Sequence, residues 1–99
     1  MTIAWPAATI VAADPNIVFC DLDNERVLLD LTSSRYFALN RVGVHVWETI
    51  ATPTSVGALQ DNIEQRFDVR PEQCRKDLES LLSDLSQFTL ISVQHAPAS

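Results

Sequence analysis

The most informative stretch of this sequence is LLDLTSSRYFALN, residues 28–40. Two apolar runs flank the polar break Thr32–Ser34, and hydroxyl side chains favour turns because they bond to nearby backbone groups. Asn40 follows the second run and is a strong helix N-cap residue. The stretch therefore predicts a β-hairpin whose second strand continues directly into a helix.

Extended runs on both sides of this stretch predict a three-stranded antiparallel meander. The runs are Ile17–Cys20, Arg26–Leu31 and Arg35–Leu39, with a polar turn at residues 23–25. Successive side chains of a strand point to opposite faces of the sheet. In the third run we therefore expect two residues to face the core, Phe37 and Leu39, and two to face away from it, Tyr36 and Ala38.

The apolar period then changes from 2 to 3.6, which predicts three helices. The first helix follows Asn40 and ends at residues 52–54, the second ends near residue 68, and the third begins at Pro71, a residue favoured in a first helical turn. Their apolar stripes are Val42, Val46, Trp47 and Ile50; Val56, Leu59, Ile63 and Phe67; and Cys74, Leu78, Leu81, Leu82, Leu85 and Phe88. Residues 90–93 read as a short extended piece.

A length of 99 residues suits one domain. We expect an N-terminal arm at residues 1–16, in which residues 9–13 either form a strand or are loose, then a folded domain at 17–93 and a flexible tail at 94–99. The element order predicts an α+β fold in which a three-stranded antiparallel meander is followed by three helices. It resembles a winged helix-turn-helix built in an unusual order.

The composition disfavours several classes of partner. The net charge is −6, which disfavours nucleic acid and anionic membranes because both require a basic face. The N-terminus lacks the basic region of a secretory signal, and no apolar run is long enough to span a membrane. We therefore expect a cytoplasmic protein. Two cysteines, Cys20 and Cys74, have no metal-ligand spacing and are expected to be free, half-buried thiols, with a disulfide as the alternative.

No motif predicts catalysis, a metal or another cofactor, and we expect none. His45 and His95 have no carboxylate or thiol at a useful spacing, and Ser33–Ser34 is not part of a nucleophile elbow. The acidic side chains around the turns lack the frame of a Ca²⁺ loop, so turn formation and solubility explain them better. These side chains are Asp21, Asp23 and Asp30.

The leucine-rich third helix has two structural interpretations and one weaker alternative. Its leucines belong first to the core, but an apolar groove rimmed by charges would bind a peptide by strand addition to an open sheet edge. Leu82 either lines such a groove or packs against residues 90–93, and the residues alone favour neither. A DNA-reading helix is disfavoured because the segment carries four acidic residues, Glu72, Asp77, Glu79 and Asp84.

Two segments of the chain resemble the PqqD-like family of small peptide-recognition domains. They are VLLDLTSSRYFALNRVGVHVWETI, residues 27–50, and RPEQCRKDLESLLSDLSQFTLI, residues 70–91. The pattern is an aliphatic strand, an Asp, a short turn, an aromatic-rich strand, an Asn, and a helix with a Gly and a Trp. Its positions here are Asp30, Tyr36, Phe37, Asn40, Gly43 and Trp47, with Asp77, Leu81, Leu82 and Leu85 later. Arg70 departs from the expected pattern, because Asp or Ser would be a better helix N-cap at this position.

The resemblance implies a stand-alone, non-catalytic adaptor from pathways that modify ribosomally made peptides, including lasso-peptide and pyrroloquinoline quinone pathways. The leader segment of a precursor peptide would add as a further strand antiparallel to the strand 35–39, in the groove against the third helix. The partner enzyme would be a leader protease, a cyclase or a radical-SAM maturase. The expected peptide-binding residues are Arg35, Tyr36, Phe37, Ala38, Leu39, Arg75, Asp77, Leu78, Leu81, Leu82 and Leu85.

Two other functions stay open from the sequence. One is a helix-turn-helix DNA-binding regulator, and the other is a structural subunit docked permanently on a larger enzyme. An open strand edge also permits self-pairing, so the expected state is a monomer or a weak dimer.

Overall fold

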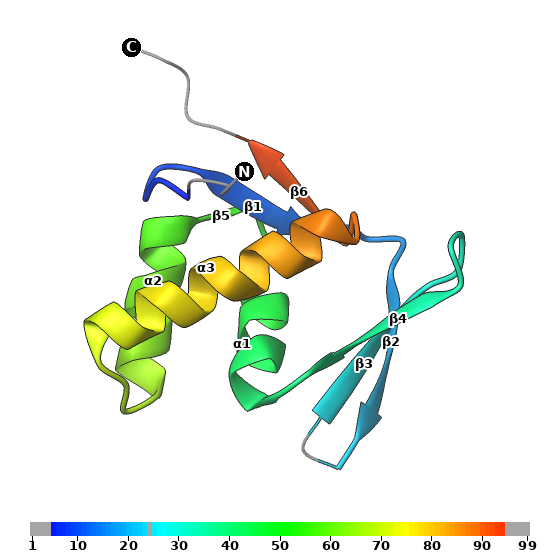
Figure 1. The fold of residues 1–99 in the computed structure, drawn as a ribbon, viewed down its shortest axis with the longest axis horizontal. Coiled ribbons are helices and arrows are strands. Elements are labelled where there is room, and N and C mark those ends of the chain that lie inside the picture. The colour runs from blue at the N-terminus through cyan, green and yellow to red at the C-terminus, as the bar shows by residue number, and fades with distance from the viewer. Residues whose placement is uncertain (1–4, 24, 95–99) are drawn as a thin grey trace.

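The structure is a computed structural model that describes residues 5–23 and 25–94. Within these residues six strands and three helices form an α+β fold. The predicted meander followed by three helices is confirmed, and a second small sheet is added to it (Figure 1). The elements are β1 Ile10–Ala13, β2 Val18–Leu22, β3 Glu25–Asp30, β4 Arg35–Leu39, α1 Arg41–Thr49, β5 Thr54–Ser55, α2 Val56–Arg66, α3 Pro71–Gln87 and β6 Ile91–Gln94.

The meander is an antiparallel sheet of order β2-β3-β4 that projects away from the helices (Figure 1). Leu28 pairs with Phe37 across β3 and β4, and its side chain is fully buried. The predicted faces of β4 are confirmed, since Phe37 is half-buried and Leu39 is buried, whereas Tyr36 is 74% exposed. Alternation along β4 therefore sets one face on the core and one toward solvent.

The turns of the meander are built by acidic and hydroxyl side chains, as the sequence predicts. Asp30 accepts hydrogen bonds from the backbone N–H of Thr32 at 3.0 Å and from the hydroxyl of Ser33 at 2.9 Å. Ser34 completes the loop with a φ of 60°. Asp21 instead pairs with Arg26, with 2.6 Å between Oδ1 and Nε. The Asp30 contacts therefore hold the loop from which β4 begins.

The second sheet has the order β5-β1-β6 and joins three segments that are distant in the sequence. β1 pairs antiparallel with β6 from Ile10↔Gln94 to Ala13↔Ile91. The N-terminal segment is therefore not a loose arm over residues 5–16. Trp5 is 2% exposed, and its indole N–H donates to the Ser83 hydroxyl at 2.9 Å. Residues 1–4, and most of the expected tail at 94–99, lie outside the described residues.

α1 begins at once after β4 because Asn40 caps it. The Asn40 side chain accepts from the backbone N–H of Gly43 at 2.9 Å, a type of cap that contributes about 1 kcal/mol. Gly43 also lets the helix approach the strand, since a Cβ there would lie 3.1 Å from Leu39 Cδ2. α3 begins with Pro71 and has no side-chain cap from Arg70, in keeping with the departure noted in the sequence.

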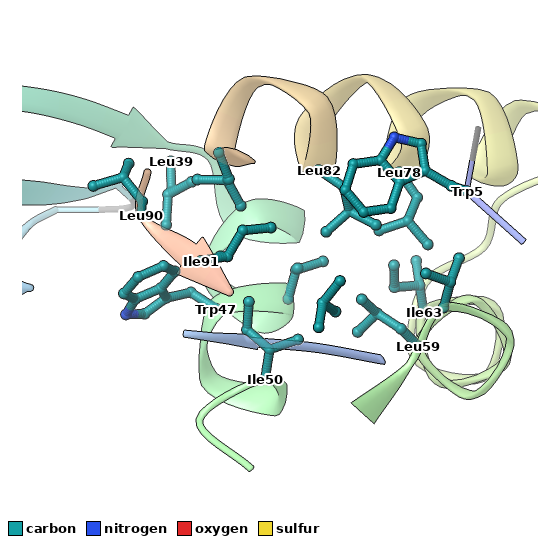
Figure 2. Close-up of a cluster of buried hydrophobic side chains, with 14 of the residues drawn as sticks. Trp5, Leu39, Trp47, Ile50, Leu59, Ile63, Leu78, Leu82, Leu90 and Ile91 are labelled. Carbon is teal, nitrogen blue, oxygen red and sulfur yellow. The ribbon is translucent and has the colours of Figure 1, made fainter. Parts of the chain in front are cut away.

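The core lies between the helices and the two sheets (Figure 2). Each predicted helical stripe contributes to it, and the fully buried leucines of α3 are Leu82 and Leu85. Leu90 and Ile91 extend the core to β6, which confirms the predicted extended piece at residues 90–93. No helix among the described residues has the length and apolarity that crossing a membrane requires.

Candidate functional site

β4 is an edge strand beside the C-terminal end of the longest helix. It pairs with β3 on one side, and among the described residues no strand pairs with its other edge. Its inner face meets α3 through Phe37, whose ring lies 5.5 Å from that of Phe88 at 75°. The Arg35 guanidinium lies 5.7 Å from the centroid of the Phe88 ring. The open edge is thus held next to an apolar helix surface.

Two hollows lie near the two ends of β4. The first, called here the Phe88 pocket, has a volume of about 330 Å³ and is lined by Ser34, Arg35, Tyr36 and Phe88. The second, called the Leu81 pocket, has a volume of about 180 Å³. It is lined by Asn40, Val42, Gly43, Val46, Ile63, Val69, Cys74, Asp77, Leu78 and Leu81. Because Asn40 directly follows β4, this pocket lies at the C-terminal end of the strand.

The spacing of the two pockets on the helix matches the strand. Leu81 and Phe88 are seven residues apart on α3, which corresponds to about 10.5 Å along a helix axis. Arg35 and Leu39 are separated by about 13 Å along a strand. The side chains of Leu81 and Phe88 are both half-buried. Each is therefore packed against the protein and still exposes apolar surface. An extended peptide along β4 could reach both pockets.

The structure brings together several of the residues that the sequence proposed as a site. Arg35 and Tyr36 line the Phe88 pocket, and Phe37 contacts Phe88 from the middle of β4. Asp77, Leu78 and Leu81 line the Leu81 pocket. Leu39 is 2% exposed and Ala38 is exposed on the outer face. Asp77 Oδ1 accepts from the side-chain amide of Gln73 at 2.8 Å, a neutral donor that brings no opposite charge to the carboxylate.

Three expected site residues lie elsewhere. Leu82 and Leu85 are 0% exposed (Figure 2 labels Leu82), so the expectation that they form a groove wall is wrong: both side chains point into the core. Arg75 is directed away from β4. Its guanidinium donates to the Trp5 carbonyl and to Gln60 Oε1, the latter at 3.1 Å, and approaches Glu79 at 3.6 Å. Arg75 fastens the N-terminal segment rather than rimming the edge.

From the sequence alone, Phe88 is expected only in the apolar core stripe of the third helix. Its position seven residues after Leu81 places both on one side of α3, and this periodicity was the available signal. α1 and the segment after α2 contribute Val42 and Val69 to the Leu81 pocket. No periodicity in the sequence indicates these two residues, because only the folded chain brings them together.

A third cavity, about 420 Å³, lies between the β2–β3 hairpin and the first two helices, away from the edge of β4. Its lining is mostly charged: Asp21, Asp23, Glu25, Arg41, Val44, His45, Glu48, Arg66 and Phe67. Arg26 bridges Asp21 and Glu48 beside it, at 2.6 and 3.1 Å. His45 Nε2 lies 2.6 Å from Asn62 Oδ1, and the described residues include no cluster of three metal-ligating side chains. His95 is outside them.

The structure shifts the pKa values of Asp30 and Cys74. The hydrogen bond from Ser33, followed by that from Thr32, lowers the pKa of Asp30 below its ordinary value. Burial raises the pKa of the Cys74 thiol, and the charges of Glu64 and Asp77 act in the same direction. Both cysteines are free, but neither is half-buried as expected: Cys20 is exposed and Cys74 is buried.

Comparisons with known proteins identify the family and the fold. The family model described as "Coenzyme PQQ synthesis protein D (PqqD)" matches residues 25–91, which include β3, β4 and all three helices. Among curated protein sequences, none is significantly similar.

Two solved structures share the fold. TbiB1, solved in complex with the TbiA(beta) leader peptide, has a TM-score of 0.73 and 26% identity, covering 87% of this chain and 99% of that one. The solution structure of the PqqD truncation of Methylobacterium extorquens PqqCD is described as a functional, stand-alone recognition element for ribosomally synthesised and post-translationally modified peptides. Its TM-score is 0.73 at 20% identity, covering 90% of this chain and 95% of that one.

Proposed function

The chain belongs to the PqqD family, and from this membership we infer that it is an adaptor that recognises the leader segment of a ribosomally made precursor peptide. The observation that carries the inference is the open edge of β4, held beside α3 by the contact between Phe37 and Phe88. A relative of the same fold, TbiB1, was solved with a leader peptide.

The leader would bind by strand addition to β4. An exposed sheet edge supplies backbone N–H and C=O groups, and alternate side chains of the added strand enter pockets. The Phe88 and Leu81 pockets at the two ends of β4 suit this mode. An antiparallel leader would run from the Leu81 pocket to the Phe88 pocket. Each apolar side chain that it buries would contribute about 1.5–3 kcal/mol.

The adaptor would carry out no chemistry itself and would present the leader to a modifying enzyme in the cytoplasm, where the precursor is made. A leader protease, a cyclase and a radical-SAM maturase all fit this role. A single extended peptide bound at one edge leaves the rest of the precursor free, which is the arrangement that presentation to an enzyme requires.

A backbone amide NMR titration tests the proposal. The ligand is the leader half of the small peptide encoded beside this gene, and the control is the same sequence scrambled. We expect shifts concentrated at residues 35–40, 77–81 and 88, with little change at the polar cavity around His45. Absence of shifts at millimolar leader, or shifts confined to the β2 edge, would contradict leader binding at β4.

A further inference from the structure

The direction of the backbone groups along β4 follows from the hairpin before it. Leu22 and Glu25 pair across a connection of two residues. In such a hairpin the closing pair exchanges both backbone hydrogen bonds, and bonded and non-bonded pairs then alternate along an antiparallel ladder. Residues 25, 27 and 29 of β3 therefore direct their N–H and C=O groups toward β2. Residues 26, 28 and 30 direct theirs toward β4.

The register between β3 and β4 determines which residues of β4 direct their backbone groups toward the open edge. The β4 partners of residues 26, 28 and 30 are Leu39, Phe37 and Arg35. These three bond to β3, so their backbone groups are not available outside. Tyr36 and Ala38 must then direct two N–H and two C=O groups away from the sheet. Their side chains lie on the outer face, whereas Phe37 faces α3.

We propose that the recognised segment is an extended tripeptide, antiparallel to β4, whose first and third residues exchange backbone hydrogen bonds with Ala38 and Tyr36. Its middle residue lies opposite Phe37 and directs an apolar side chain inward beside Phe37 and Phe88. This inference rests on the proposed function and deepens it. It makes the first and third positions tolerant of side-chain change and the middle position selective.

The charged side chains near the two ends of β4 favour opposite charges at the two ends of the bound peptide segment. Asp77 lines the Leu81 pocket, where an antiparallel peptide would have its N-terminal side. Arg35 lines the Phe88 pocket at the other end. Among the described residues neither side chain has an ion-pair partner within 4.0 Å. The preferred segment therefore has a basic residue before the tripeptide and an acidic residue after it.

Residue-resolved amide hydrogen exchange tests the backbone assignment before any peptide is added. In the free protein, Phe37 and Leu39 amides should exchange slowly, and Tyr36 and Ala38 amides should exchange at least tenfold faster. The opposite order would overturn the proposal and leave leader binding itself untouched. With the leader of the neighbouring precursor peptide added, the Tyr36 and Ala38 amides should become protected.

The remaining outcomes separate the two levels of inference. A leader that shifts β4 resonances but leaves both amides unprotected would overturn the tripeptide register, while the adaptor function stands. Failure of the leader to bind at all would overturn both. A set of leaders with single N-methyl groups should lose binding at two positions that are two residues apart, each by tenfold or more, and tolerate the methyl group between them.

A protein variant provides an independent check. Ala38→Pro removes an N–H that the fold does not use, and edge strands accept proline at such positions. It should keep its fold by circular dichroism and lose leader affinity at least tenfold, whereas the Ala38→Gly control should stay close to wild type. Wild-type affinity in folded Ala38→Pro would contradict the assignment. Asp77→Lys should lower the affinity only for leaders with the upstream basic residue, and unchanged affinity there would exclude the proposed polarity.

Discussion

The rings of Phe37 and Phe88 meet edge to face, with centroids 5.5 Å apart, and join the inner face of β4 to the end of α3. One partner comes from the middle of an edge strand, and the other is the C-cap residue of the longest helix. Because the meander projects away from the helices, this pair fixes the distance between the open edge and the apolar side of α3.

Phe88→Ala should weaken both the fold and leader binding. Loss of the aromatic pair and of half-buried surface should lower the free energy of unfolding by about 1–3 kcal/mol. Leader affinity should fall about tenfold or more, measured by fluorescence anisotropy on the folded fraction. Phe67→Ala is the matched control, because Phe67 makes an equivalent edge-to-face contact with His45 at 5.6 Å, away from β4. Equal losses of leader affinity in both variants would argue against a site at Phe88.

The adjacent leucines of α3 should separate stability from binding. Leu82 is fully buried, so Leu82→Ala should cost about 2–5 kcal/mol in chemical denaturation. Leu81 is half-buried at its pocket, so Leu81→Ala should cost about 1 kcal/mol and reduce leader affinity. A Leu82→Glu variant would bury an unpaired charge and prevent folding. If Leu81→Ala bound the leader as tightly as wild type, the Leu81 pocket would have no role in recognition.

The hairpin before β4 should lose stability in acid. Hydrogen bonds from Ser33 and Thr32 lower the pKa of Asp30 below 3.8 in the folded state. A lowered folded pKa contributes stability that is present above the unfolded value and is lost as the pH falls through the folded one. The titration of the Asp30 carboxyl carbon by NMR should therefore show a midpoint below 3.8, and Ser33→Ala should raise it. An identical midpoint in wild type and Ser33→Ala would refute this account.

The two thiols should differ sharply in reactivity. Cys20 is exposed, whereas Cys74 is 5% exposed and burial raises the pKa of its thiol, which lowers the thiolate fraction at pH 8. One equivalent of an aromatic disulfide reagent should react rapidly with the native protein and a second only on unfolding. Cys20→Ser should remove the fast phase. If Cys74→Ser removed the fast phase instead, the reagent would be reaching the buried Cys74, which would show that α3 opens readily.

Much of the fold could be predicted because its signals are local. The hydroxyl-rich turn, the alternation in Arg35–Leu39 and the Asn40 cap each act within a few residues of one another. The β5-β1-β6 sheet is different, because Ile10 pairs with Gln94 and Ser55, which are distant in the sequence. Strands of four and two residues are too short for a periodicity that would indicate such partners. For the same reason, no local signal indicates that Trp5 belongs to the core.

The candidate site divides in the same way. The edge strand and its facing residues were predicted, but the helix residues beside it were predicted only in part. Leu81 and Leu82 are chemically identical neighbours, and the rotation of α3 that buries one and not the other depends on packing against both sheets. Arg75 has the exposure and charge of a rim residue until the fold brings Trp5 to it.

The antiparallel pairing of Ile10 with Gln94 brings the first and last strands of the described residues together, in a sheet that does not include β4. A domain with adjacent boundaries can be circularly permuted or inserted into a loop of another protein with little distortion. In either arrangement the open edge of β4 would stay clear of the junction. The topology thus makes the domain a transferable module, one that can be grafted onto a chosen enzyme as a cassette without redesign of its strand edge.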